Sequence, residues 1–213
     1  HQIVRNHAET LSISIMIFCF AKFTNPNFED NTNYLKVFFY CLILAIATFC
    51  RPNFFPATSI LFIYLFFISV KRSYMLSASA VLGFSFVFVS LFHNYYFGND
   101  ISLFTKSDIH FVFNDAFANL NLQKIENNFV INQFIKWNPI YNIHRLFILI
   151  FIIYCFFRFE KNNINILLFS SAISQHIVLL LTHPDSRYAY LAWLLTFILF
   201  VNYLFNFYLK KLK

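Results

Sequence analysis

The stretch "MLSASAVLGFSFVFVSLFHNYYF" (residues 75–97) decides the fold class, because it contains no Lys, Arg, Asp or Glu. A helix of about 20 apolar residues crosses the hydrocarbon core of a bilayer. The run ends in His93, Asn94 and two tyrosines, directly before one of the only two glycines in the chain. We therefore expect a membrane-spanning helix with a chemically active end.

The rest of the chain has the same character. Hydrophobic residues make up 59% of it, aromatic residues 22% and charged residues only 12%, whereas soluble domains carry about 25% charged residues. The sequence predicts an all-α fold, a polytopic transmembrane helix bundle of about seven spans in a single transmembrane domain over residues 1–213. The expected spans are residues 8–23, 35–50, 54–70, 75–97, 139–157, 164–182 and 188–209.

Basic residues predict the orientation of these spans, because short connections rich in Lys and Arg stay on the cytoplasmic side. Such residues occupy alternate connections: Lys22 with Lys36, Lys71 with Arg72, Arg158 with Lys161, and the tail with Lys210, Lys211 and Lys213. The opposite ends then face outward. We expect a multi-pass protein of a bacterial inner membrane with its active face outward.

One long connection, residues 98–138, lies on the predicted outer side. Asp115 is a suitable helix N-cap, and the apolar residues after it predict an amphipathic helix on the membrane surface. The alternative is a loop that packs over the bundle without a ligand role. The chain begins with His1, so we expect a fragment that lacks an N-terminal part.

Polar chemistry inside the spans is sparse. All nine acidic residues lie at or outside span ends, which disfavours ion-coupled transport. Within one span, "SSAISQH" (residues 170–176) places Ser171 and Gln175 one helical turn apart. Hydrogen bonds between helices explain these residues, and a ligand role for His176 is the alternative. Neither the histidines nor the four cysteines have a metal-site or disulfide spacing, so we expect no metal and interpret the cysteines as packing residues.

Cations stand at two of the predicted outer ends. Arg51 and Arg187 each follow or precede an apolar run, and a guanidinium forks onto phosphate oxygens. A lipid-linked phosphate would meet them at the membrane interface. The alternative is that both arginines only anchor helix ends, with Tyr95 and Tyr188 belonging to the interfacial aromatic belt.

The order of four motifs resembles a known family. "HAETL" (7–11) enters a span, "RPNFFP" (51–56) follows the next, "HNYYFGN" (93–99) ends a later one, and "SRYAYL" (186–191) enters the last. This order is similar to the C-terminal half of GT-C-type integral membrane glycosyltransferases, the group with protein O-mannosyltransferase-like, aminoarabinose transferase-like and GPI-mannosyltransferase-like enzymes. Phe54 departs from the glycine often found in the second motif.

The resemblance implies transfer of a sugar from a polyprenyl-phosphate donor to an acceptor on the non-cytoplasmic face. It implies donor-phosphate binding by Arg51 and Arg187, and it places five residues in contact with the cavity or head group. These are Glu9, His93, Asn94, Tyr95 and Tyr188. Gly98 would turn the chain into the outer loop. The main catalytic carboxylate would lie upstream of His1, so no catalytic residue is assigned, and the lipid-linked sugar is the only cofactor-like group expected.

Two other functions fit the same residues. A transporter or flippase for a lipid-linked or anionic solute would use the arginines as a gate, and a non-catalytic membrane scaffold would need no ligand. The expected partners are membrane lipid and the polyprenyl-phosphate sugar. Nucleic-acid binding is disfavoured, because the basic residues are scattered over span ends instead of forming one patch.

Overall fold

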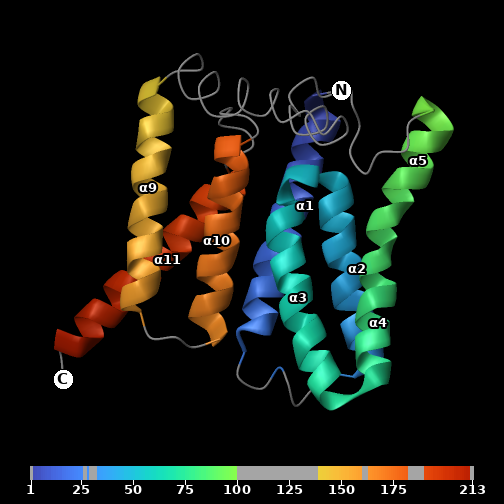
Figure 1. The fold of residues 1–213 in the computed structure, drawn as a ribbon, viewed down its shortest axis with the longest axis horizontal. Helices are drawn as coiled ribbons and strands as arrows, with labels where there is room; N and C mark the ends of the chain where they lie inside the picture. The colour runs from blue at the N-terminus through green and yellow to red at the C-terminus, as the bar shows by residue number, and fades with distance from the viewer. Residues whose placement is uncertain are drawn as a thin grey trace, which may run out of the picture. The chain divides into compact units, whose positions relative to one another are not determined.

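A computed structural model describes residues 2–25, 28, 33–99, 139–159, 163–181 and 190–211. Within them the chain is all-helical, and each of the seven predicted apolar runs forms a helical rod (Figure 1). The chain divides into two compact units, His1–Ser107 and Asp108–Lys213. Residues 100–138, with the predicted surface helix, lie outside the described residues. That the whole chain forms one domain stays a prediction.

The first unit contains four rods that run alternately up and down (Figure 1). They are α1 (Gln2–Phe23), α2 (Tyr34–Cys50), α3 (Phe55–Arg72) and a composite rod of α4 (Tyr74–Phe84), the 3₁₀ turn η2 (Ser85–Phe88) and α5 (Val89–Gly98). A second 3₁₀ turn, η1 (Pro52–Phe54), joins α2 to α3. The central element is α2, which packs against α1, α3 and α4.

Short polar residues fix the helix ends of this unit. The side chain of Asn33 caps α2 by accepting a hydrogen bond from the Lys36 N–H at 2.9 Å. Ser73 ends α3 and begins α4: its N–H donates to the Ser69 carbonyl at 2.9 Å, and its Oγ accepts from the Met75 N–H at 3.2 Å. A one-residue corner of this kind holds α3 and α4 next to each other.

Gly83 allows the backbones of α2 and α4 to approach closely. A Cβ at this position would clash with the Phe38 carbonyl oxygen and would lie 2.9 Å from the Cβ of Cys41. Glycine within a helix costs about 1 kcal/mol relative to alanine. The close contact explains its presence, since only a residue without a side chain allows the two backbones to approach this closely.

Buried polar groups also join α2 to α3. The hydroxyls of Thr48 and Thr58 lie 2.7 Å apart, and both side chains are buried. Thr48 Oγ1 also lies 3.1 Å from the Leu44 carbonyl and Thr58 Oγ1 3.0 Å from the Phe55 carbonyl. The two hydroxyl hydrogens thus have partners within the unit, which makes the burial of these groups tolerable.

The second unit contains α9 (Pro139–Arg158), α10 (Asn163–Leu181) and α11 (Tyr190–Lys211). The middle helix, α10, packs against both others. Towards α9, the ring of Phe169 meets those of Phe156 and Phe159 edge-on. Towards α11, the Asn202 amide donates to Asn165 Oδ1 at 3.3 Å. The core of this unit is therefore aromatic on one side of α10 and partly polar on the other.

Two helices in the described part of the chain, Phe55–Arg72 and Tyr74–Phe97, are long and apolar enough to cross a membrane. Only 28% and 22% of their apolar windows are buried. Large side chains point outward instead, with Phe67 60% and Phe92 74% exposed. The core helix of a soluble protein would be mostly buried, so these two helices have an unusually apolar exterior.

The cysteines lie in the helices as free thiols. Cys19 and Cys41 are fully buried and Cys155 is nearly so, in agreement with the packing role predicted for them. Cys50, at the end of α2, is partly exposed.

Candidate functional site

The predicted outer residues of the first unit gather at one end of it. Arg51 directly follows α2, in extended conformation, and its N–H donates to the Ala47 carbonyl at 3.0 Å. Its own carbonyl accepts from the Phe54 N–H at 2.9 Å. These bonds fix the backbone of Arg51 between α2 and α3. The Arg51 side chain is half-buried.

The register of α1 and α2 brings Glu9 to the height of Arg51. Ser12 Oγ donates to the Ala47 carbonyl at 3.3 Å, and the two helices run antiparallel (Figure 1). Glu9 lies three residues before Ser12 and Arg51 four residues after Ala47, which is about one helical turn in each case. An acidic and a basic residue thus stand at the same level of the unit. The side chain of Glu9 lies outside the described residues.

His93 and Asn94 reach the same end from α5. The His93 ring meets Phe49 of α2 edge-on at 6.3 Å between ring centroids, and Phe49 lies two residues before Arg51. His93 Nδ1 is 3.4 Å from Asn94 Oδ1. Asn94 is buried, while His93 and Tyr95 are exposed. Helix α5 therefore presents an imidazole and a phenol outward over a buried amide.

The turn at this end differs from the expectation. Helix α5 includes Gly98, and the left-handed residue is Asn99, with φ of 49°. The Asn99 N–H donates to the Tyr95 carbonyl at 3.0 Å. Assigning the turn to Gly98 was therefore wrong by one residue. Asparagine tolerates this conformation better than most residues with a side chain.

The structure thus brings Arg51, His93 and Asn94 to one end of the first unit, with Glu9 at the same height. Arg187 and Tyr188, the other predicted contacts, lie outside the described residues. Their association with Arg51 stays a prediction.

A second polar group lies within the other unit. His176 Nε2 is 2.8 Å from Thr196 Oγ1, and the Thr196 hydroxyl donates to the Ala192 carbonyl at 2.8 Å. Because a hydroxyl has one hydrogen, Thr196 accepts at the imidazole, so Nε2 carries a hydrogen. His176 is 1% exposed, and its ring also meets Trp193 edge-on. This bond links α10 to α11 through His176, a residue for which the sequence had suggested only a ligand role.

The sequence did not reveal Thr196 as the partner. It lies in an apolar run, twenty residues from His176, and only the packing of α10 on α11 brings the two together.

Ser171 and Gln175 are less completely paired. Both are buried, and Ser171 Oγ and both amide atoms of Gln175 have no hydrogen-bond partner in the described part of the chain. A buried polar group in this state costs about 1–3 kcal/mol. The hydrogen bonds between helices predicted for these two side chains are therefore not formed there.

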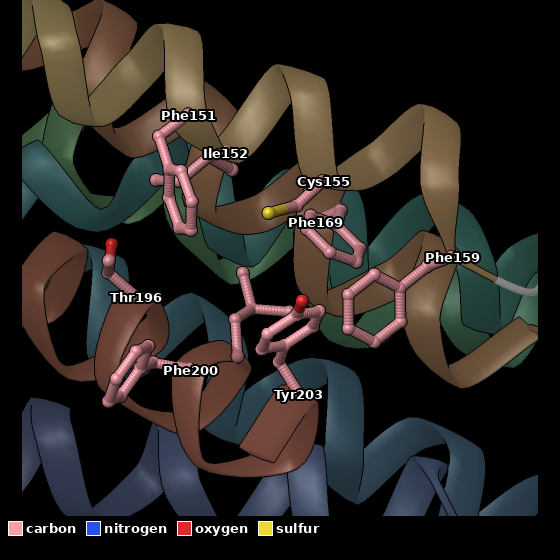
Figure 2. A pocket seen from close by; sticks show the side chains of 9 residues that line it. Phe151, Ile152, Cys155, Phe159, Phe169, Thr196, Phe200 and Tyr203 are labelled. Atoms are coloured by element: carbon pink, nitrogen blue, oxygen red, sulfur yellow. The ribbon is translucent and has the colours of Figure 1, made fainter. Parts of the chain in front are cut away.

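Figure 2 shows a small cavity beside the same helices. It has a volume of about 20 Å³ and is lined by Phe151 and Cys155 of α9, Phe169 of α10, and Thr196 and Tyr203 of α11, among others. That is room for about one water molecule. The apolar lining makes it a packing gap, not a candidate ligand site.

Replacing Thr196 by valine is expected to lower the free energy of unfolding of the second unit by about 1–3 kcal/mol, because the buried Nε2–H loses its acceptor. Thermal unfolding of the full chain in detergent measures this change. Thr196→Ser keeps the hydroxyl and is expected to retain most of the stability. A Thr196→Val variant as stable as the wild type would contradict a contribution of this hydrogen bond to stability.

No protein family, curated protein or solved structure matches this chain.

Proposed function

We propose that this chain is a multi-pass membrane protein, with all seven rods crossing the bilayer, and that it acts as a GT-C-like glycosyltransferase. Support for membrane insertion comes from the outward-facing apolar side chains of α3 and of the α4–α5 rod. In water such surfaces would promote aggregation, whereas lipid solvates them.

The observation that carries the proposed chemistry is that Arg51, His93 and Asn94 lie at the same end of the first unit, level with Glu9. The guanidinium of Arg51 would hold the phosphate of a polyprenyl-phosphate sugar through two parallel hydrogen bonds. Negative charge grows on this phosphate as the bond to the sugar breaks, so a fixed cation lowers the barrier.

The neighbouring groups suit a sugar head group. The imidazole of His93 and the phenol of Tyr95 donate and accept hydrogen bonds, as sugar hydroxyls require. Arg187 and Tyr188 stay predicted contacts of the same donor. The base that deprotonates the acceptor hydroxyl is not assigned to this chain.

A transporter or flippase is the second candidate, favoured by Ser171, Gln175 and His176 in the middle of α10. Polar and ionisable residues within a membrane helix commonly mark a solute path. On this alternative the same outer cations would form an entrance gate.

Replacing Arg51 by alanine is expected to reduce sugar transfer at least tenfold, because a charge-assisted hydrogen bond contributes about 1.5–3 kcal/mol. Membrane vesicles with the full-length protein are supplied with radiolabelled polyprenyl-phosphate sugars, and label in the acceptor is counted. Arg187→Ala tests the second predicted cation. Arg158→Ala is the matched control, because Arg158 is an exposed arginine at the end of α9, stacked over Tyr154.

The outcomes separate the candidates. Transfer that falls with Arg51→Ala but not with Arg158→Ala supports the enzyme. Labelled lipid that crosses the membrane without transfer contradicts the enzyme and favours the flippase. If no carrier gives either sugar transfer or lipid crossing, the result favours the non-catalytic membrane scaffold.

A further inference from the structure

A groove runs along the first unit at the junction of α3 and α4. It is lined by Phe66 of α3, by one side of α4 from Tyr74 to Leu82, and by Ser85 at the start of η2, with a volume of about 420 Å³. The corner at Ser73 joins the two helices at one end of it. This end of α3 is the one opposite Arg51, so the groove is separate from the proposed sugar site.

The lining is suited to a hydrocarbon chain. Ala78, Val81 and Leu82 face the groove and are exposed. Its two serines use their hydroxyl hydrogens locally: Ser77 donates to the Tyr74 carbonyl at 2.8 Å, and Ser85 of η2 donates to the Leu82 carbonyl of α4 at 2.7 Å. Neither serine therefore needs a polar ligand as hydrogen-bond acceptor.

The length of the groove matches one leaflet. From Tyr74 to Ser85 an α-helix rises about 16 Å, and half of a hydrocarbon core is about 15 Å thick. An acyl chain that starts at the Ser73 corner would follow the groove to the middle of the bilayer.

Positive charge stands at the mouth of the groove. Lys71 and Arg72 form the last turn of α3 and are exposed, directly before the Ser73 corner. The described charged side chains at this end of the unit are all cationic and include Lys36 of α2. Glu29 and Asp30, in the connection before α2, lie outside the described residues. Basic residues next to a membrane surface attract anionic lipids.

We propose that this groove binds one anionic phospholipid, with an acyl chain along α4 and the phosphate at Lys71 and Arg72. The inference rests on the membrane insertion in the proposed function and is independent of sugar transfer. Arginine and lysine together provide forked hydrogen bonds and a point charge for the phosphate. A zwitterionic lipid binds less tightly, because its own ammonium opposes the two cations.

The test uses the full chain purified in mild detergent and titrated with phosphatidylglycerol or phosphatidylcholine. Native mass spectrometry counts the lipids bound per chain. We expect one tightly bound phosphatidylglycerol. The double variant Lys71→Gln, Arg72→Gln should weaken it about 30-fold, equivalent to about 2 kcal/mol for two cations. Ala78→Phe, which fills the groove from an exposed position, should also weaken it.

Two matched variants control for charge and bulk. Lys36→Gln removes a cation from the same end of the unit without altering the groove, and Ala21→Phe adds the same bulk on an exposed part of α1. Both are expected to retain phosphatidylglycerol binding. Equal binding of the two lipids by the wild type would overturn the proposal, as would a loss in Lys36→Gln as large as in the double variant.

Carbonate extraction of the membranes keeps the two proposals apart. A chain released by carbonate would contradict membrane insertion and hence both proposals. A chain that stays in the membrane and binds phosphatidylglycerol, yet transfers no sugar, would contradict only the enzyme.

Discussion

Leucine in place of Gly83 is expected to lower the free energy of unfolding of the first unit by more than about 3 kcal/mol. Inserting atoms into a packed core costs about 1–3 kcal/mol even where side chains adjust. Here the obstacle includes backbone, the Phe38 carbonyl, and cannot rotate away. Alanine should also destabilise, although it gains about 1 kcal/mol in helix propensity.

The thiol of Cys41 reports on this contact. It is fully buried, and its Cβ would lie 2.9 Å from a Cβ at position 83. With the other three cysteines replaced by alanine, a maleimide in detergent should label Cys41 slowly in the wild type and rapidly in Gly83→Leu. Ala78→Leu introduces the same side chain at an exposed position of α4 and should leave Cys41 protected. Equal protection in Gly83→Leu would contradict the close approach of α2 and α4.

Two substitutions of Gln175 are expected to act in opposite directions. Leucine has a similar size and needs no hydrogen bonds, so Gln175→Leu should raise the free energy of unfolding of the second unit by about 2 kcal/mol. Glutamate would place a charge among apolar groups, so Gln175→Glu should lower it by about 3 kcal/mol. The pair isolates the polarity of this side chain from its volume.

Trp193 makes this change measurable, because it lies in the same unit and its ring meets His176. With Trp137 replaced by phenylalanine, denaturant titration of the full chain follows Trp193 fluorescence alone. Ile177→Leu, two residues along α10 at an exposed position, is the neutral control. If Gln175→Leu destabilises as much as Gln175→Glu, the amide has a partner beyond the described residues, and the prediction of an unmet polar group is wrong.

The helices were predictable because apolar runs near 20 residues leave few other structures open to the chain. The residues at which the helices begin and end were harder to predict. The first helix begins at Gln2, six residues before the expected start. At the end of α5, Gly98 and Asn99 both tolerate the left-handed conformation, so local sequence did not distinguish between them.

Much of the candidate site could be predicted because successive helices run in alternate directions. Connections of an up-and-down bundle meet at alternate ends, which placed Arg51 with His93 and Asn94. The level of Glu9 relative to Arg51 depends on the contact of Ser12 with Ala47, and helix register is not encoded in composition. The pairing of His176 with Thr196 depends on how α10 and α11 are rotated, which the weak periodicity of these apolar helices leaves open.

The composite rod of α4, η2 and α5 is longer than the hydrocarbon core of a membrane is thick. Its Tyr74–Phe97 part has 24 residues, about 36 Å at the α-helical rise, and the 3₁₀ geometry of η2 adds about 2 Å. In a hydrocarbon core of about 30 Å the rod must tilt or extend past the boundary. The exposed rings of Tyr95, Tyr96 and Phe97 suit the head-group layer. On the proposed membrane insertion, hydrophobic mismatch couples the depth of His93 and Asn94 to bilayer thickness, and a thinner membrane would move both residues further into the water.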